Sequence, residues 1–190
     1  MRHSSLGGAW EFLVSGIVRG RDERGRLILD RTGPFMPPIT IPDPEIVVSN
    51  DFREQLSQAL PELEFREVIK GKIVEVFWEE WDRNDLPAEA PIDGEPDAYI
   101  MLGQASPRAA EGLGRLWEVV LHEGARSRTE PALPFPHFSL VLDTATWDGS
   151  DVFLTTPHLL PMIVVTERAR IAMTGLAHEW VSFKPVKTNW

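Results

Sequence analysis

The chain has 190 residues, of which 43% are hydrophobic and 25% charged, a composition typical of globular proteins with a sizeable core. It contains no cysteine, which excludes disulfides, thiolate metal sites and cysteine nucleophiles and fits a reducing compartment. The formal net charge of −10 disfavours binding to nucleic-acid phosphates and favours a basic partner.

The first segment, residues 1–45, predicts a hairpin and a connector. Residues 10–18 and 27–30 are apolar and β-rich on either side of a polar turn. Five prolines between positions 34 and 44 exclude helix and central strand, so an extended connector follows. The chain start lacks the apolar core of a signal peptide, and no apolar run approaches the ~20 residues of a membrane helix. We therefore expect a soluble, cytoplasmic protein without a membrane segment.

Two stretches, residues 46–68 and 163–186, share one design. Each begins with Ile-Val-Val, a short apolar run that predicts a buried strand, and continues with a hydroxyl residue, Ser49 or Thr166, suited to capping a helix. Apolar residues follow at helical spacing, and a second strand closes each unit. We predict two similar strand–helix–strand units with four buried helix residues: Phe52, Leu56, Ala169 and Met173.

The part between these units predicts strands and one long helix. Residues 69–81 carry the strongest strand pattern, a run of β-branched and aromatic side chains. Residues 84–97 have loop composition, and Ala98–Leu102 indicates a short buried strand. Ser106-Pro107 is a typical helix start. An apolar stripe then predicts a helix that ends at Gly124.

This predicted helix determines how two side chains are interpreted. Trp117 lies on its apolar stripe, so we expect the indole to be buried. His122 falls in its last turn, where a histidine complements the helix dipole. The helix completes a second segment, residues 46–124.

The third segment, residues 125–190, begins with a connector that contains three prolines, at residues 125–137. Strands are predicted at 138–143 and 152–156, with a polar turn between them, before the second repeated unit. The three segments indicate one compact domain or two closely packed halves. The fold class is α+β, with a mixed or antiparallel sheet and few short helices.

The negative charge is concentrated in residues 75–97, which hold nine acidic residues and one basic residue and so carry −8. Two tryptophans stand among these acids. Aromatic residues beside charges are typical of protein interfaces, although the same tryptophans suit a role in covering the sheet. The candidate partner-binding residues are Trp78, Glu79, Glu80, Trp81, Asp82 and Asp85.

No pattern indicates catalysis. The chain lacks a phosphate-binding glycine loop and a GxSxG elbow, and no two of its five histidines have the i, i+4 spacing of a helical metal site. Paired acids at Glu79-Glu80 and Asp148–Asp151 are compatible with a hydrolase. A solvent-exposed rim for the first pair and a turn for the second account for them better. We predict no catalytic residue, no metal site and no cofactor.

The C-terminal part resembles a known signature. Residues 139–186 contain a strand that ends in Asp, a D-G-x-D turn followed by Val-Phe, an apolar strand with Thr and a short helix, and a final aromatic-x-Pro-Val. These elements are carried by Asp143, Asp148-Gly149, Asp151, Val152-Phe153, Val164-Val165, Thr166 and Phe183-Lys184-Pro185-Val186. This stretch, about a quarter of the chain, is similar to the C-terminal signature of the imm11-type family of bacterial immunity proteins, which accompany polymorphic toxins.

The resemblance implies a non-enzymatic protein that binds and neutralises a cognate toxin in the cytoplasm. Toxins that act on nucleic acid are basic on that surface, so an acidic inhibitor suits them. Two alternatives stay open on the sequence: a small cytoplasmic hydrolase that uses acidic residues, and a structural or regulatory module that self-associates through sheet edges.

Overall fold

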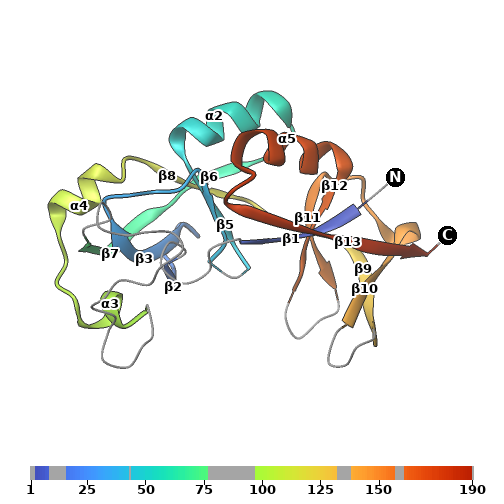
Figure 1. The fold of residues 1–190 in the computed structure, drawn as a ribbon, viewed down its shortest axis with the longest axis horizontal. Coiled ribbons are helices and arrows are strands. Elements are labelled where there is room, and N and C mark those ends of the chain that lie inside the picture. Colours follow the sequence, from blue (N-terminus) through green and yellow to red (C-terminus); the bar gives the residue numbers. More distant parts are fainter. Residues whose placement is uncertain are drawn as a thin grey trace. The chain divides into compact units, whose positions relative to one another are not determined.

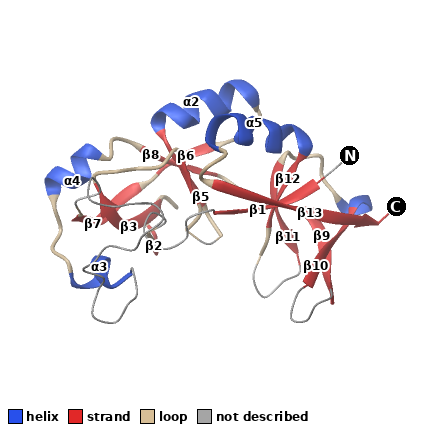
Figure 2. Cartoon of the chain, viewed as in Figure 1, coloured by secondary structure: helices blue, strands red, loops and turns tan. Residues whose placement is uncertain are grey.

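The computed structural model describes residues 3–8, 16–42, 44–76, 97–131, 138–156 and 161–189 (Figure 1). The fold is α+β, as predicted, and its strands form mixed and antiparallel sheets (Figure 2). The chain forms two units. Unit 1 comprises residues 1–9, 54–64 and 120–190, and unit 2 comprises residues 10–53 and 65–119.

Unit 1 is a closed barrel of strands, with helix α5 (Glu167–Ala177) in contact with three of them. Around the barrel, the strands are β1 (His3–Gly8), β12 (Ile163–Thr166), β11 (Val152–Thr156), β9 (Glu123–Pro131), β10 (Phe138–Asp143) and β13 (Val181–Asn189). Strand β1 pairs antiparallel with β12 on one side and with β13 on the other. The pairs β9–β11 and β10–β13 are parallel.

The barrel is filled by side chains around Phe153. This fully buried ring packs with Ala125, Leu142 and Val164. The ring of Trp147 lies beside it, with 6.5 Å between the ring centroids. Gly124 allows the backbone to pass close to Phe153, since a Cβ there would lie 2.6 Å from the Phe153 Cβ.

Both repeated stretches form strand–helix–strand units, which confirms the prediction. One consists of β12, α5 and β13, and the Thr166 hydroxyl accepts a bond from the amide of Ala169 at 3.3 Å. The other consists of β5 (Ile46–Ser49), α2 (Asn50–Ala59) and β6 (Phe65–Glu67), and the Ser49 hydroxyl accepts from the Phe52 amide at 3.3 Å. The four predicted helix residues Phe52, Leu56, Ala169 and Met173 are all buried.

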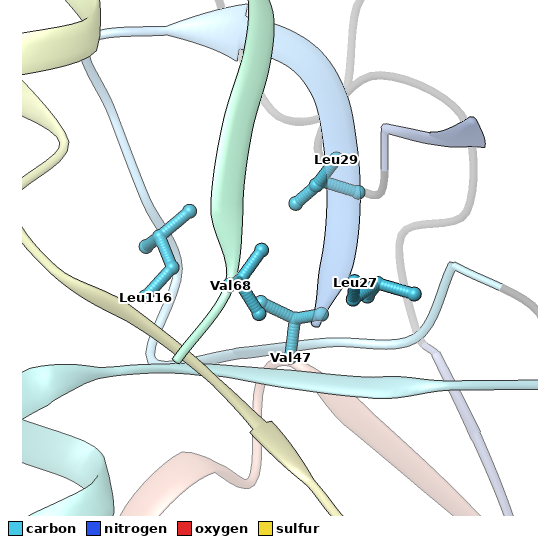
Figure 3. Packing of buried hydrophobic residues seen from close by; sticks show 5 residues of the cluster. All are labelled: Leu27, Leu29, Val47, Val68 and Leu116. Carbon is cyan, nitrogen blue, oxygen red and sulfur yellow. The ribbon is translucent and has the colours of Figure 1, made fainter. Parts of the chain in front are cut away.

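Unit 2 contains two sheets. Their strands, in order, are β4 (Ile39–Thr40), β5, β8 (Leu116–Val119) and β6 in one, and β2 (Ile17–Arg21), β3 (Leu27–Gly33) and β7 (Ile69–Glu75) in the other. Figure 3 shows how side chains from both sheets converge: Leu27, Leu29, Val47, Val68 and Leu116 form one buried cluster. Strand β4 shows that the proline-rich connector contains a short paired segment.

The predicted long helix from Ser106 to Gly124 is wrong beyond its first turns. Ser106 caps helix α4 (Pro107–Gly112) by accepting a bond from the Ala109 amide, as expected, but the helix stops at Gly112. Gly114 then adopts φ +63°, which lies outside the helical region. The next residues, rich in aromatic and β-branched side chains, form β8 instead. His122 therefore lies in the link between β8 and β9, and not at a helix end.

Three other boundaries differ from the predictions. Ala98–Leu102 lies in helix α3 (Asp97–Leu102), because three of its five residues are strong helix formers and only Ile100 is β-branched. The predicted connector at 125–137 is part of β9 as far as Pro131, and residues 132–137 lie outside the described residues. Of the first predicted hairpin strand, Ile17 and Val18 lie in β2, which extends into the predicted turn as far as Arg21, and residues 10–15 lie outside the described residues.

Arg31, in β3, is a fully buried cation. Its guanidinium donates to the backbone carbonyls of Thr32 at 2.9 Å and Phe35 at 3.1 Å, and it contacts the sulfur of Met36. Within the described ranges no carboxylate pairs with it. Because water is excluded, the charged form is disfavoured, and burial lowers the pKa of Arg31 to about 9.

Trp117 is half-buried on β8, which corrects the expected full burial on a helix. Two guanidinium groups lie over its indole ring, with the Cζ atoms of Arg53 at 4.4 Å and Arg115 at 4.6 Å from the ring centroid. Its Nε1–H donates to Asn50 Oδ1 at 3.0 Å. The Trp117 side chain is therefore held mainly by cation–π contacts and one hydrogen bond, and less by burial in a hydrophobic core.

We expect Trp117→Ala to lower the free energy of unfolding by about 2 kcal/mol, because it removes two cation–π contacts and a hydrogen bond. Trp117→Phe keeps an aromatic ring for the two arginines and should cost only about 1 kcal/mol. Urea unfolding of both variants measures the difference. Equal losses for the two variants would show that the arginine contacts contribute nothing.

Candidate partner-binding surface

The predicted acidic site lies outside the described residues. Trp78, Glu79, Glu80, Trp81, Asp82 and Asp85 all fall between Val76 and Asp97, where the structure describes no residue. Their role in binding stays a prediction. What the structure does describe is the pair of anchors at which this segment begins and ends, strand β7 and helix α3.

The β7 anchor is fixed by backbone and side-chain bonds. The Val76 amide donates to the Gly33 carbonyl at 2.9 Å, and Val74 forms an antiparallel bridge with Ala105. The Ser106 hydroxyl donates to the carboxylate of Glu75 at 3.1 Å. The acidic segment therefore leaves β7 from a position that is tied to the start of α4.

The α3 anchor is held against β7. Ala98 and Ile100 are buried, and Lys72 Nζ donates to the Met101 carbonyl at 2.8 Å, which satisfies a free carbonyl at the helix end. Gly103 then passes so close to β7 that a Cβ at this position would lie 2.4 Å from Val74 Cγ1. The helix is short, but its buried face and its C-terminal end are both held in place.

This anchored helix exposes two large apolar side chains. Met101 is 70% exposed and Leu102 is 78% exposed, the highest values among the large hydrophobic residues that the structure describes. The strand prediction for Ala98–Leu102 expects a buried run, so it misses this surface. A helical interpretation of the same residues was available from their propensities, but the sequence contains no signal for which side faces water.

The acids of the C-terminal signature have structural partners. Asp143 accepts a bond from the Ala145 amide at the 3-10 turn η2 (Thr144–Thr146), and Asp148 accepts from the amide and hydroxyl of Ser150. These bonds are those of tight turns.

Asp151, which directly precedes β11, is buried beside the first residues of α5. It accepts bonds from the Thr166 hydroxyl and from Arg168, whose Nε lies at 2.8 Å, and Arg168 also pairs with Glu62. Asp148 and Asp151, the acids of the hydrolase alternative, are thus bound to different partners.

Histidines and acids do not assemble into a metal-type group in the part of the chain that the structure describes. His122 and His178 are exposed, whereas His137 and His158 lie outside the described residues. No helix in the described ranges is both long enough and apolar enough to cross a membrane.

Comparison of the chain with protein-family models, curated proteins and solved structures found no match.

Proposed function

We propose that this chain is a non-enzymatic immunity protein that binds and neutralises a cognate basic toxin in the cytoplasm. The observation that carries the proposal is that the acidic residues of the immunity-like signature have structural roles. Asp143, Asp148 and Asp151 accept bonds that shape turns and a helix start, and Phe153 fills the barrel. The signature residues thus stabilise the fold. An inhibitor that acts by covering a surface requires a stable fold and no catalytic group.

The charge of the chain supports the same proposal. Residues 75–97 carry −8 of the net −10, so one stretch supplies most of the negative field. Such a field raises the rate of encounter with a basic protein and repels nucleic acid. A toxin that acts on nucleic acid presents the complementary charge at the surface that an inhibitor has to cover.

The test is co-expression in bacteria with the products of the neighbouring genes, one of which we expect to encode the toxin. We expect growth to be restored when this protein is produced together with the toxin, and the two purified proteins to form a stable complex. An unrelated acidic protein of similar size, expressed at the same level, is the control for charge alone. Continued toxicity despite folded, abundant protein would overturn the proposal.

A further inference from the structure

The two repeated units each hold a third strand between their own two strands. In unit 2, β8 lies between β5 and β6 and is antiparallel to both. In unit 1, β1 lies between β12 and β13 and is likewise antiparallel to both (Figure 1). The central strand comes from outside the repeated stretch in each case, because β8 follows its stretch in the chain and β1 precedes its own. Each repeated unit therefore takes up one strand from elsewhere.

The central strands also enter in the same register. In both repeated units one central residue has the middle valine of Ile-Val-Val on one side and, on the other, the basic residue that follows the phenylalanine of the closing strand: Glu118 lies between Val47 and Arg66, and Ser5 lies between Val164 and Lys184. The sequences of β8 and β1 have no residue in common at the equivalent positions. The two outer strands, more than the sequence of the central strand, thus set this pairing.

The central strand of unit 1 has a weak strand sequence. It reads HSSLGG, with two glycines, two serines and one large apolar residue, Leu6. Glycine weakens the interior of a strand, because it has no side chain to pack. The equivalent strand β8 reads LWEV, and its residues Leu116, Glu118 and Val119 are buried. Much of what β1 contributes is backbone pairing, which any extended segment is able to supply.

We propose that the position of β1 between β12 and β13 is a binding site for an extended segment of a partner protein, which pairs with both strands in place of β1. The favoured segment follows β8, with a large apolar residue at the position of Leu6 and an acidic residue at the position of Ser5. The acid is complementary to Lys184, just as Glu118 stands opposite Arg66. The inference goes beyond the proposed function, since the partner need not be a toxin.

The exchange is balanced in its backbone bonds. Displacing β1 breaks its pairing with β12 and β13, and the entering strand restores the same pairing, so the side chains decide the outcome. Replacing a strand glycine by a β-branched or aromatic residue favours the entering segment by up to about 1 kcal/mol. A second copy of this chain is a poorer occupant, because its β1 brings the same weak sequence and gains nothing by the exchange.

The experiment uses a fluorescent peptide with the sequence of residues 114–121, GRLWEVVL, and a variant of the full chain, Gly7→Cys/Ser182→Cys. The two positions are directly opposite in β1 and β13, within reach of a disulfide, and the chain has no other cysteine. Oxidation holds β1 in place, so the oxidised variant should bind the peptide at least about 20-fold more weakly than the reduced variant. Fluorescence anisotropy measures both affinities. Equal affinities would overturn the inference, because the peptide would then bind elsewhere, for example in place of β8.

A charge exchange tests the register. The same peptide with Glu118→Lys should bind the wild-type protein about 5-fold more weakly, because its lysine would stand opposite Lys184. The protein variant Lys184→Glu should reverse this preference and bind the lysine peptide better. Two peptides that bind alike to both proteins would contradict the register and therefore the site.

Two further measurements cover a tightly held β1 and a dimer. Leu6→Ser removes the large apolar side chain of β1 and should raise the affinity for the peptide at least about 5-fold, with circular dichroism as the check of folding. Absence of binding to both the wild type and folded Leu6→Ser would refute the site. A covalent dimer of the oxidised cysteine variant on a non-reducing gel would assign the position to β1 of a second copy instead. Failure of the co-expression test leaves all these results unchanged, so the two proposals fail separately.

Discussion

Phe153→Ala should lower the free energy of unfolding by about 3–5 kcal/mol, the largest single-residue effect that we expect in this protein. The ring is fully buried and packs with Ala125, Leu142 and Val164 inside the barrel. Removing it deletes these contacts and leaves a cavity, which a closed ring of strands is poorly able to fill by collapse. A loss of this size is a large part of the 5–15 kcal/mol typical of a domain.

Urea unfolding followed by tryptophan fluorescence measures this effect. Phe35→Ala is the control, because it removes the same side chain from a position that is 38% exposed and should cost less than about 1 kcal/mol. Phe153→Leu should recover most of the loss, because it refills part of the space. A cost for Phe153→Ala no greater than that for Phe35→Ala would contradict the packing described for the barrel.

The second large effect is a dependence of stability on alkaline pH that originates at Arg31. Its pKa is about 9 in the folded protein, against an ordinary value of 12.5. Between these values the unfolded state binds more protons than the folded state, so the free energy of unfolding rises with pH. Below pH 9 the arginine is charged in both states and its unfavourable burial is present in full.

From pH 9 to pH 10.5 the expected gain is about 1.6 kcal/mol, because the slope is half of about 1.4 kcal/mol per pH unit at the folded-state pKa and approaches the full value above it. Arg31→Met keeps a similar volume and removes the cation, so the difference between wild type and variant should change by this amount. The comparison cancels the titration of lysines and of the single tyrosine, which both proteins share. A difference that stays flat across this range would show that Arg31 keeps its proton when buried.

The elements predicted correctly are those where several local signals agree. In both repeated units a β-branched run is followed by a hydroxyl cap and then by apolar residues at helical spacing, and the capping bonds of Ser49 and Thr166 are present. Local chemistry is sufficient in such stretches, because the cap, the strand and the buried helix face each favour the same structure.

The misassigned elements are those where tertiary contacts decide. Residues 116–121 have helical apolar spacing, yet β8 forms between β5 and β6, and Glu118 is buried in it because Arg21 pairs with its carboxylate at 2.5 Å. An ion pair with a residue 97 positions away leaves no trace in a local pattern. The alternation that would have identified the strand is hidden by this buried acid.

The candidate site, too, was only partly predictable from local sequence patterns. The sequence identifies the acidic segment by charge alone, and its six predicted binding residues remain a prediction. The exposed pair Met101 and Leu102 was not predictable, because an apolar residue is assigned to the core unless the tertiary structure places it at the surface. In the structure α3 buries Ala98 and Ile100 and leaves Met101 and Leu102 exposed.

The position of β1 in the barrel has a consequence for folding during synthesis. This strand precedes all of unit 2 in the chain, yet it pairs with β12 and with Val181–Val186 of β13, which follow unit 2. Contacts of such sequence separation give a high contact order and slow closure. During translation β1 must therefore wait with an unpaired edge while unit 2 is produced, so we expect nascent chains to depend on chaperones until β13 is available.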